Sequence, residues 1–292
     1  MAEMTSIAGE PGTHDPSTDG VTIRHVSTHD EFAACVELQA ATWGPAFRET
    51  VPATILKVSQ RLGGVTAGAF ASDGTLLGFV FGMTGIERGA IVHWSDLLAV
   101  RVGMQNHGLG RRLKEFQREA LRSVGATRIY WTYDPLVARN AHFNLNRLGV
   151  RVAEYVPDMY GTNTGSELHS GVGTDRFIVD WPIGPPRHAR PGTPHEVKPG
   201  EGSLHDTPIL NARTEDGRDP DVARFSAFLP PIVRIEIPHD IFSVLAESAT
   251  RAARWRKTTR LAFQWALASG YTVERFEHNG GDGRGFYCLT RS

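Results

Sequence analysis

The sequence predicts a mixed α/β fold with a largely antiparallel sheet, followed by a smaller C-terminal α+β lobe. Three observations favour it. Apolar runs in the N-terminal half are joined by hairpin turns, which suits a mixed sheet better than a doubly wound one. One of these runs leads through a glycine turn into an amphipathic helix. A Pro/Gly-rich stretch then precedes a second set of a strand, a helix and two strands.

The first predicted elements follow a polar tail, residues 1–20, which we expect to be disordered. The segment 21–27 reads as a strand, and Thr28 or Asp30 can cap the helix after it. A second helix ends at a glycine pair, and three apolar strands come next. Ser-Asp-Gly at 72–74 predicts a hairpin between the first two of these strands.

The clearest helix begins after residue 108. Its apolar side chains recur at helical spacing opposite a face of Arg, Lys, Glu and Gln, and Gly125 ends it. A strand at 127–135, a short helix ending at Gly149 and two further strands complete a first domain, 21–181.

The second half of the chain divides at a change of composition. Residues 182–224 lack periodicity and predict an extended linker, and 225–292 predict the C-terminal α+β lobe. Within that lobe, 241–269 reads as one helical stretch, and the segment that begins at residue 254 has a basic start, RWRKTTR at 254–260. Such a start also occurs in nucleic-acid and membrane contacts, but the flanking strands favour a packed unit.

Composition argues against several classes of partner. Lys plus Arg total 31 and Asp plus Glu total 32, so a net charge of −1 disfavours nucleic acid or an anionic membrane as the main partner. The two cysteines and twelve histidines show no metal-binding spacing, so we expect no metal. No signal peptide and no run of about 20 apolar residues is apparent, and the cytoplasm is the expected location.

The segment QNHGLG, residues 105–110, lies between an apolar strand and the clearest helix. Amides at a helix start carry a partial positive charge, and glycine lets an anion approach them, so the segment is a candidate phosphate-binding loop. An ordinary strand-to-helix turn is the alternative interpretation. The segment is neither a GxxxxGK[ST] loop nor a dinucleotide fingerprint.

In its wider context, LLAVRVGMQNHGLGRRL resembles the signature of the GNAT superfamily of acyl-CoA-dependent N-acyltransferases, (Gln/Arg)-x-x-Gly-x-(Gly/Ala) after an apolar strand. Gln105, Gly108 and Gly110 occupy those places. The following strand and the helix with Asn140 also match, and residues 21–181 accommodate the ordered elements of a GNAT acyltransferase fold. More narrowly, the chain is similar to a bacterial subgroup of predicted GNAT acetyltransferases with an additional C-terminal region.

The resemblance implies acetyl-CoA or another short acyl-CoA, such as succinyl-CoA, as cosubstrate, and no metal. Its pyrophosphate would bind the loop, its pantetheine arm would pair with the strand as a pseudo-strand, and an asparagine would bind the arm from the far side. The implied cofactor-binding residues are Leu98, Ala99, Val100, Gln105, Asn106, His107, Gly108, Leu109, Gly110, Arg111 and Asn140.

The resemblance also asks for a base and an acid. Asp96 is the candidate base, expected on the face of Leu98, although the subgroup usually has histidine there; a structural strand acid is the alternative, and His93 and Glu87 are weaker options. The family often places the acid, a tyrosine, where Leu145 stands. Tyr160 is the favoured substitute, with Tyr155 and Tyr133 as alternatives.

Arg176 and Tyr133 are the candidate substrate-binding residues. The arginine would hold a carboxylate of the substrate or of a succinyl group, unless it only pairs with Asp175. The implied acceptor is the amine of a small molecule, with an amino acid as the leading example. A protein-lysine acetyltransferase and a non-catalytic acyl-CoA sensor remain alternatives, and the C-terminal lobe either closes the acyl pocket or mediates a homodimer.

Overall fold

The computed structural model describes residues 20–161, 172–184, 207–211, 229–279 and 283–291. The chain divides into two compact units, the first holding 1–133, 163–170 and 179–184, and the second holding 134–162, 171–178 and 185–292. Nearly all of the predicted tail and most of the predicted linker lie outside the described residues. The predicted domain boundaries therefore stay predictions.

The first unit is built on a sheet. Its elements are β1 (Thr22–His25), α1 (His29–Trp43), α2 (Ala53–Arg61), β2 (Val65–Phe70), β3 (Leu76–Glu87), β4 (Ala90–Val100), α3 (Leu109–Ser123), β5 (Arg128–Tyr133) and the C-terminal part of β7 (Arg176–Pro182). The strand order of the seven-stranded sheet is β1-β2-β3-β4-β5-β7-β6. Neighbouring strands from β1 to β4 are antiparallel, whereas β4 and β5 are parallel, which confirms the predicted mixed sheet.

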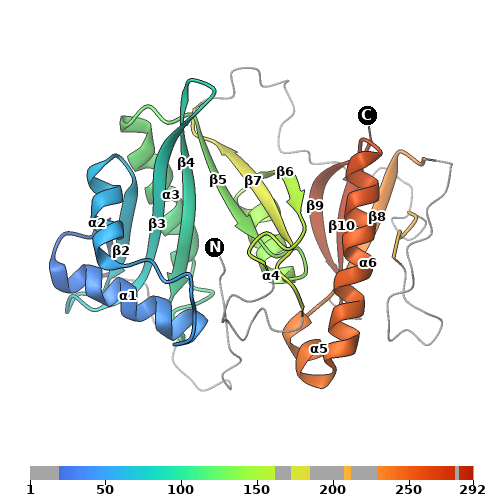
Figure 1. The fold of residues 1–292 in the computed structure, drawn as a ribbon, viewed down its shortest axis with the longest axis horizontal. Helices are drawn as coiled ribbons and strands as arrows, with labels where there is room; N and C mark the ends of the chain where they lie inside the picture. The colour runs from blue at the N-terminus through green and yellow to red at the C-terminus, as the bar shows by residue number, and fades with distance from the viewer. Residues whose placement is uncertain (1–19, 162–171, 185–206, 212–228, 280–282, 292) are drawn as a thin grey trace. The chain divides into compact units, whose positions relative to one another are not determined.

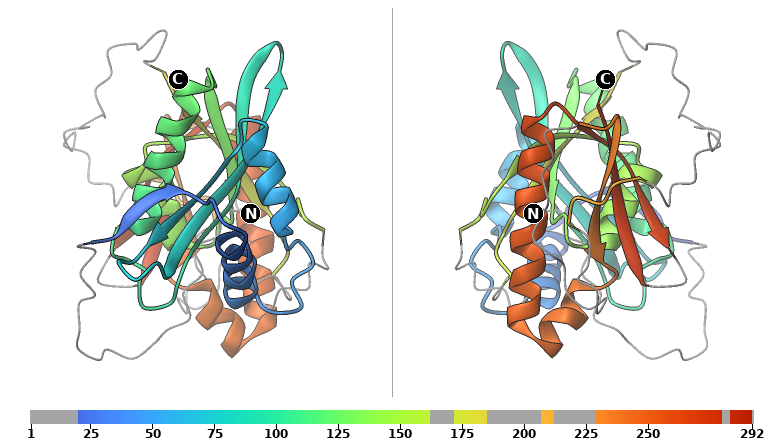
Figure 2. Two further views of the ribbon diagram at one scale, coloured as in Figure 1. Left: turned by 90° about the vertical axis from the view of Figure 1, so that its left-hand side faces the viewer. Right: turned by 90° about the vertical axis from the view of Figure 1, so that its right-hand side faces the viewer.

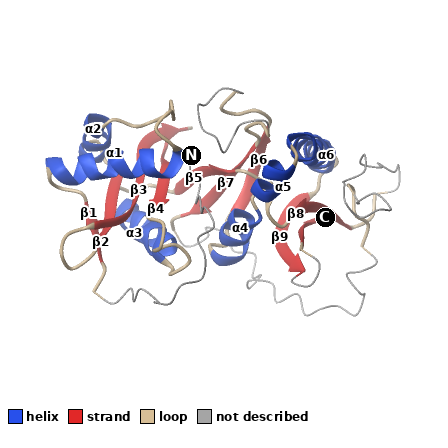
Figure 3. Cartoon of the chain, turned by 90° about the horizontal axis from the view of Figure 1, so that it is seen from below, coloured by secondary structure: helices blue, strands red, loops and turns tan. Residues whose placement is uncertain are grey.

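Helices cover both faces of this sheet. Helices α1 and α2 pack on one face and α3 on the other (Figures 2 and 3). Thr28 is the N-cap of α1, and Glu31 completes the capping box by accepting from the cap backbone, which confirms one of the two predicted caps. Helix α3 begins and ends close to its predicted bounds.

Hairpins join β2 to β3 and β3 to β4. The predicted turn at 72–74 is confirmed, with Gly74 at φ 87° and the amide of Thr75 bonded to the Asp73 carboxylate. The second hairpin turns at Arg88 and Gly89, both at positive φ, and projects past the end of α2 (Figure 2).

The second unit is the predicted α+β lobe together with the segment after β5. Its elements are α4 (Ala138–Ala141), the π-helix η1 (His142–Arg147), β6 (Arg151–Val156), the first residues of β7, β8 (Ile232–Pro238), α5 (Ile241–Glu247), α6 (Ala249–Ala268), β9 (Thr272–Asn279) and β10 (Arg284–Thr290). Strands β8, β10 and β9 form a separate antiparallel sheet in that order, and α6 packs on β8 (Figure 1).

The prediction of one helix over 241–269 is wrong at Ser248. This residue is extended, with φ −163° and ψ 111°, and its hydroxyl accepts from the amide of Arg251, so it caps a new helix. The buried stripe of α6 consists of Ala252, Trp255, Arg256, Thr258, Thr259, Ala262, Phe263 and Ala266. Small and polar residues supply most of this stripe, which is why bulky apolar residues alone did not reveal its periodicity.

Residues 207–211, within the predicted linker, pack against β8. Ile209 forms an isolated bridge with Arg234, and the Asn211 amide exchanges hydrogen bonds of 2.8 and 2.9 Å with the backbone of Glu236. In the described part of the chain, no helix is both long and apolar enough to cross a bilayer. Those same residues contain no group of three potential metal ligands.

Candidate functional site

Strands β4 and β5 of the first unit pair over only part of their length. Their parallel ladder joins Val92 to Arg128, His93 to Ile129 and Trp94 to Tyr130, and the register ends there. In Figure 1 the two strands lie side by side near the β3–β4 turn and separate toward their other ends. From Ser95 onward β4 therefore presents one backbone edge that β5 does not pair.

A β-bulge in β4 lies at this point of separation. Leu97 pairs with Phe81 and Ser95 pairs with Gly82, so Asp96 is an extra residue with no partner position on β3. Bulges bend a strand and redirect a side chain, and they are frequent next to active sites. Asp96, which is half-buried, is thus placed by a local irregularity and not by regular strand geometry.

The bulge changes which residues of β4 share a face. Leu98 pairs with Val80 and Ser95 with Gly82, and these two β3 residues are on the same face, so Ser95 and Leu98 are too. The expectation that Asp96 lies on the face of Leu98 assumed unbroken alternation, and the bulge interrupts that alternation.

The edge of β4 that β5 does not pair presents the backbone groups of Leu98 and Val100. The amide of Arg101 donates to the carbonyl of Leu77, so this residue, and Ala99 two positions earlier, direct their backbone groups toward β3. The intervening residues direct theirs toward the opposite edge, where the ladder with β5 has already ended. This edge could accept an extended ligand as an additional strand.

Gln105 connects the end of β4 to the loop that follows. Its side-chain amide donates to the carbonyl of Val100 at 3.1 Å, which occupies one outward-facing backbone group and leaves the amide of the same residue facing outward. Three loop residues adopt positive φ, namely Gly103 at 89°, Asn106 at 66° and Gly108 at 79°. Two of these positions are glycine, for which this conformation carries no steric penalty.

The loop ends at the N-terminus of α3. Gly108 is the N-cap, and no side chain of the described residues caps the helix, so the amides of Leu109, Gly110 and Arg111 have neither an intrahelical nor a side-chain acceptor. A Cβ at Gly108 would meet nothing within 4 Å. These amides, and the partial positive charge of the helix end, are suited to bind a phosphate group.

The two arginines at the start of α3 differ in how available they are to a bound anion. Arg111 is half-exposed and forms a surface ion pair with Glu115 at 2.8 Å, which an anion at the helix end can compete with. The guanidinium of Arg112 instead donates to the carbonyl of Val21 at 2.9 Å and stabilises the position of β1.

A buried amine lies beneath the point where β4 and β5 separate. The Nζ atom of Lys114 is 2.7 Å from the hydroxyl oxygen of Ser95 and 3.8 Å from the ring centroid of Trp131. The lysine is fully buried, and this burial lowers its pKa well below the usual value.

His93 occupies the neighbouring buried position on β4. Its ring nitrogens contact the Thr84 hydroxyl at 3.0 Å and the Gln117 amide at 3.1 Å. Burial first, and then the nearby charge of Lys114, lower the pKa of His93 to about 3. The ring fits because residue 82 is glycine, where a Cβ would lie 2.2 Å from Nε2. A fully enclosed, satisfied imidazole is a structural group, so Asp96 is the better candidate base.

The other predicted site residues come from both units. Tyr133, at the end of β5, is in the first unit and fully buried. Asn140, Tyr160 and Arg176 belong to the second unit. The asparagine is buried in α4, and its backbone carbonyl accepts from Asn144 at 2.8 Å. The roles predicted for all four stay predictions.

Arg176 lies in a polar cluster of the second unit. Its side chain is fully buried, 3.5 Å from the carboxylate of Asp134, and 5.3 Å above the ring of Tyr160. It also donates to the backbone carbonyl of Asp175. A substrate carboxylate would therefore have to compete with Asp134 for this guanidinium.

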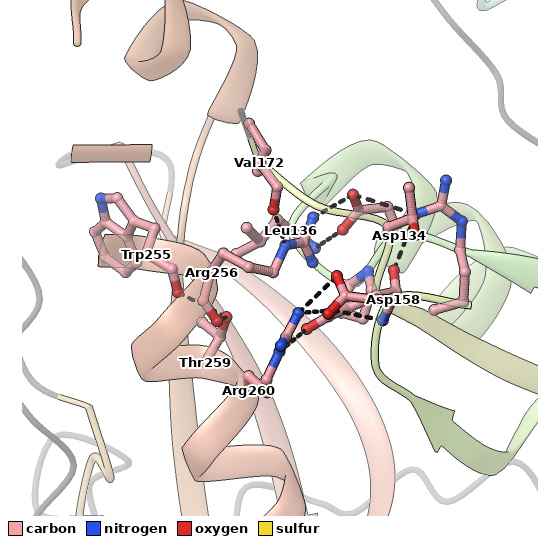
Figure 4. A network of polar contacts seen from close by, with 12 residues as sticks. Asp134, Leu136, Asp158, Val172, Trp255, Arg256, Thr259 and Arg260 are labelled. Carbon is pink, nitrogen blue, oxygen red and sulfur yellow. Dashed lines mark hydrogen bonds and ion pairs between the residues drawn. The ribbon is translucent and has the colours of Figure 1, made fainter. Parts of the chain in front are cut away.

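Sequence reasoning missed two ion-pair groups of this cluster (Figure 4). Arg256 of α6 donates to Asp134 at 2.5 Å and to the carbonyl of Val172 at 2.8 Å, and its side chain is 5% exposed. Asp134 also accepts from the amide of Leu136 at 2.8 Å. The signal available in the sequence was that Arg256 follows Ala252 by four positions, which places both residues on one face of a helix.

The second group centres on Asp175. Arg260 and the hydroxyl of Tyr155 donate to its carboxylate, and Arg260 also pairs with Asp158 at 2.9 Å. Burial alone would raise the pKa of Asp175, but hydrogen bonds from Arg260 and the charge of Arg256 lower it. Two of the four basic residues of the segment RWRKTTR, Arg256 and Arg260, therefore form internal ion pairs, which supports the packed-unit interpretation.

No protein-family model matches the chain, and no curated protein has a matching sequence. Solved structures are similar over part of it. The NatC complex bound to Gag peptide and CoA matches with 17% identity, 56% of this chain, 98% of that chain and a TM-score of 0.44. An aminoglycoside 6′-N-acetyltransferase complexed with coenzyme A matches with 13% identity over 57% of this chain and 99% of that chain, at a TM-score of 0.44.

A further similar structure is yncA, a putative acetyltransferase from Salmonella typhimurium with its cofactor acetyl-CoA. It shares 19% identity over 59% of this chain and 98% of that chain, at a TM-score of 0.44. At such identities and TM-scores the likeness by itself assigns no activity to the chain.

Proposed function

We propose that the chain is an acyl-CoA-dependent N-acyltransferase of the GNAT superfamily that acts on the amine of a small molecule. One observation supports this proposal most strongly. The edge of β4 at Leu98 and Val100, which β5 does not pair, leads directly into a loop and then into the amides at the start of α3. A single ligand with an extended arm and a diphosphate suits this sequence of features, and coenzyme A is such a ligand.

The proposed reaction is direct attack in a ternary complex. The acyl carrier supplies an activated thioester, and a deprotonated amine attacks its carbonyl carbon, which breaks the bond to sulfur. Asp96, placed by the bulge, takes the proton from the attacking ammonium. The outward-facing amide of Val100 donates to the oxygen on which negative charge develops. These roles are assigned from placement and from the family resemblance.

The remaining residues are proposed on the resemblance alone. Tyr160 would protonate the leaving thiolate, Asn140 would bind the pantetheine arm, and Arg176 and Tyr133 would contact the substrate. An acetyl or succinyl group is the proposed acyl chain, and an amino acid or related metabolite is the proposed acceptor. The absence of a tyrosine at Leu145 favours a second candidate function, an acyl-CoA sensor without turnover.

Two measurements, made one after the other, test the proposal. Acetyl-CoA and succinyl-CoA are titrated into the protein by calorimetry, and release of the free thiol is then followed with the tighter ligand and a panel of amino acids. A lysine-containing peptide in the same panel tests the protein-lysine alternative. We expect saturable binding and amine-dependent thiol release. Binding without release for any amine would support the sensor, and no binding of either ligand would refute both functions.

A further inference from the structure

Lys114 is an unusual occupant of its position on α3. The neighbouring buried positions of this helix include Leu109, Leu113 and Leu121, and an unbranched apolar side chain would suit the same site. Burying an amine costs free energy unless its donors find acceptors. The amine of Lys114 contacts one hydroxyl, that of Ser95, and one ring face, that of Trp131.

The location of these two contacts is informative. The β4–β5 ladder runs from Val92 paired with Arg128 to Trp94 paired with Tyr130, so its next position would pair Ser95 with Trp131. The amine of Lys114 contacts the side chains of both residues of that first absent pair. It therefore lies at the fork where the two strands separate, between the last paired residues and the bulge.

We propose that Lys114 is a positioning residue of the acyl-carrier site, whose amine holds Ser95 and Trp131 at the fork and so keeps the edge of β4 at Leu98 and Val100 open for the carrier's arm. This inference rests on the proposed function. The fork is proposed to bind only the arm of the carrier. The amides at the start of α3 are positioned by the loop before the helix and do not depend on the contacts of the Lys114 amine.

This division of roles predicts a different response from two ligands. Coenzyme A has both the diphosphate and the arm, whereas adenosine 3′,5′-diphosphate has phosphates but no arm. Lys114→Met retains the length and bulk of the side chain and removes the amine. We expect this variant to bind coenzyme A at least tenfold more weakly than the wild type and adenosine 3′,5′-diphosphate with unchanged affinity, in calorimetric titrations of the full chain.

Gln117→Met is the matched control, because it removes a buried polar group from the same face of α3 one turn later. Gln117 contacts His93, which lies within the paired part of the ladder and not at the fork. We expect its affinity for both ligands to match that of the wild type. Urea unfolding of all three proteins confirms that each is folded under the conditions of the titrations.

Amide hydrogen exchange supplies a second readout. The amides of Leu98 and Val100 should become protected when coenzyme A saturates the wild type, and they should stay unprotected in Lys114→Met at the same saturation. Equal coenzyme A affinity in both proteins would refute the role of the amine, as would an equal loss of affinity for both ligands. Failure of the wild type to bind either ligand would instead refute the proposed function.

Discussion

Gly108 and Gly125 stand at the two ends of α3 with nearly equal backbone conformations, at φ 79° and φ 77°. A Cβ would meet nothing within 4 Å at either position. The two glycines thus face the same conformational penalty on substitution, while only the first lies beside the amides of the helix start. A comparison of substitutions at the two positions therefore separates an effect on ligand binding from an effect of backbone strain.

Gly108→Ala should weaken coenzyme A binding, because the added methyl group would occupy the open space in front of the helix amides. Each of Gly108→Ala and Gly125→Ala should lower the free energy of unfolding by about 1 to 2 kcal/mol, since both force alanine into the left-handed region. Calorimetry and urea unfolding check the two effects. Equal affinities of the two variants would contradict a phosphate site at the helix start.

Asp96→Asn should slow acyl transfer by roughly 10²- to 10⁴-fold, the usual loss for a general base, while leaving the affinity for acyl-CoA unchanged. Glu87→Gln is the control, because Glu87 lies at the far end of β3 and accepts from Tyr130 at 3.0 Å. Initial rates of thiol release across pH, with the best amine, measure both. A variant Asp96→Asn that retains the wild-type rate and pH profile would remove this residue from the chemistry.

The stability of the first unit should fall as pH falls from 6.5 toward 3. His93 is buried in its neutral form, with a pKa lowered from 6.5 to about 3, so the unfolded state binds more protons in this window. The stabilisation is complete above pH 6.5, and its loss amounts to roughly 4 to 5 kcal/mol at most. Urea unfolding of both proteins measures this effect, and the free energy of unfolding should depend less on pH in His93→Gln than in the wild type. Parallel curves would contradict the assignment.

Because of Lys114, the free energy of unfolding should also depend on pH at the alkaline end of the range. Its folded pKa lies well below the ordinary 10.5 because of burial, so the unfolded state binds more protons between the two values. The unfolding free energy should therefore rise as pH increases toward 10.5. Lys114→Met should lose this rise, which urea unfolding at pH 7 to 10 measures. If the variant kept the full slope, Lys114 would not be its source.

Arg256→Met should destabilise the second unit by about 3 to 5 kcal/mol, because it removes one partner of a buried ion pair and leaves Asp134 less compensated. Lys257→Met, at an exposed position of the same helix, should change stability by less than about 0.5 kcal/mol. Thermal and urea unfolding compare the two. Similar stabilities would indicate that Arg256 contributes no more than a surface residue.

Local signals in the sequence were sufficient for most helices and strands and for the loop at 105–110. Helix caps, turn glycines and apolar periodicity act over a few residues, so Thr28, Gly74 and Gly125 could be interpreted directly. The same signals failed at Ser248, where a serine interrupts a long helical pattern, and along α6, where alanine and threonine form the buried stripe.

The bulge at Asp96, the end of the β4–β5 ladder and the contacts of Lys114 are properties of the tertiary structure. Each depends on pairing or packing between segments far apart in the chain, and nothing in the local pattern of β4 reveals where β5 ceases to pair with it. The carboxylate partners of Arg256 and Arg260 are likewise 85 or more positions away. Local periodicity specifies which residues form an element, whereas long-range packing decides which backbone edge and which charges remain available to a ligand.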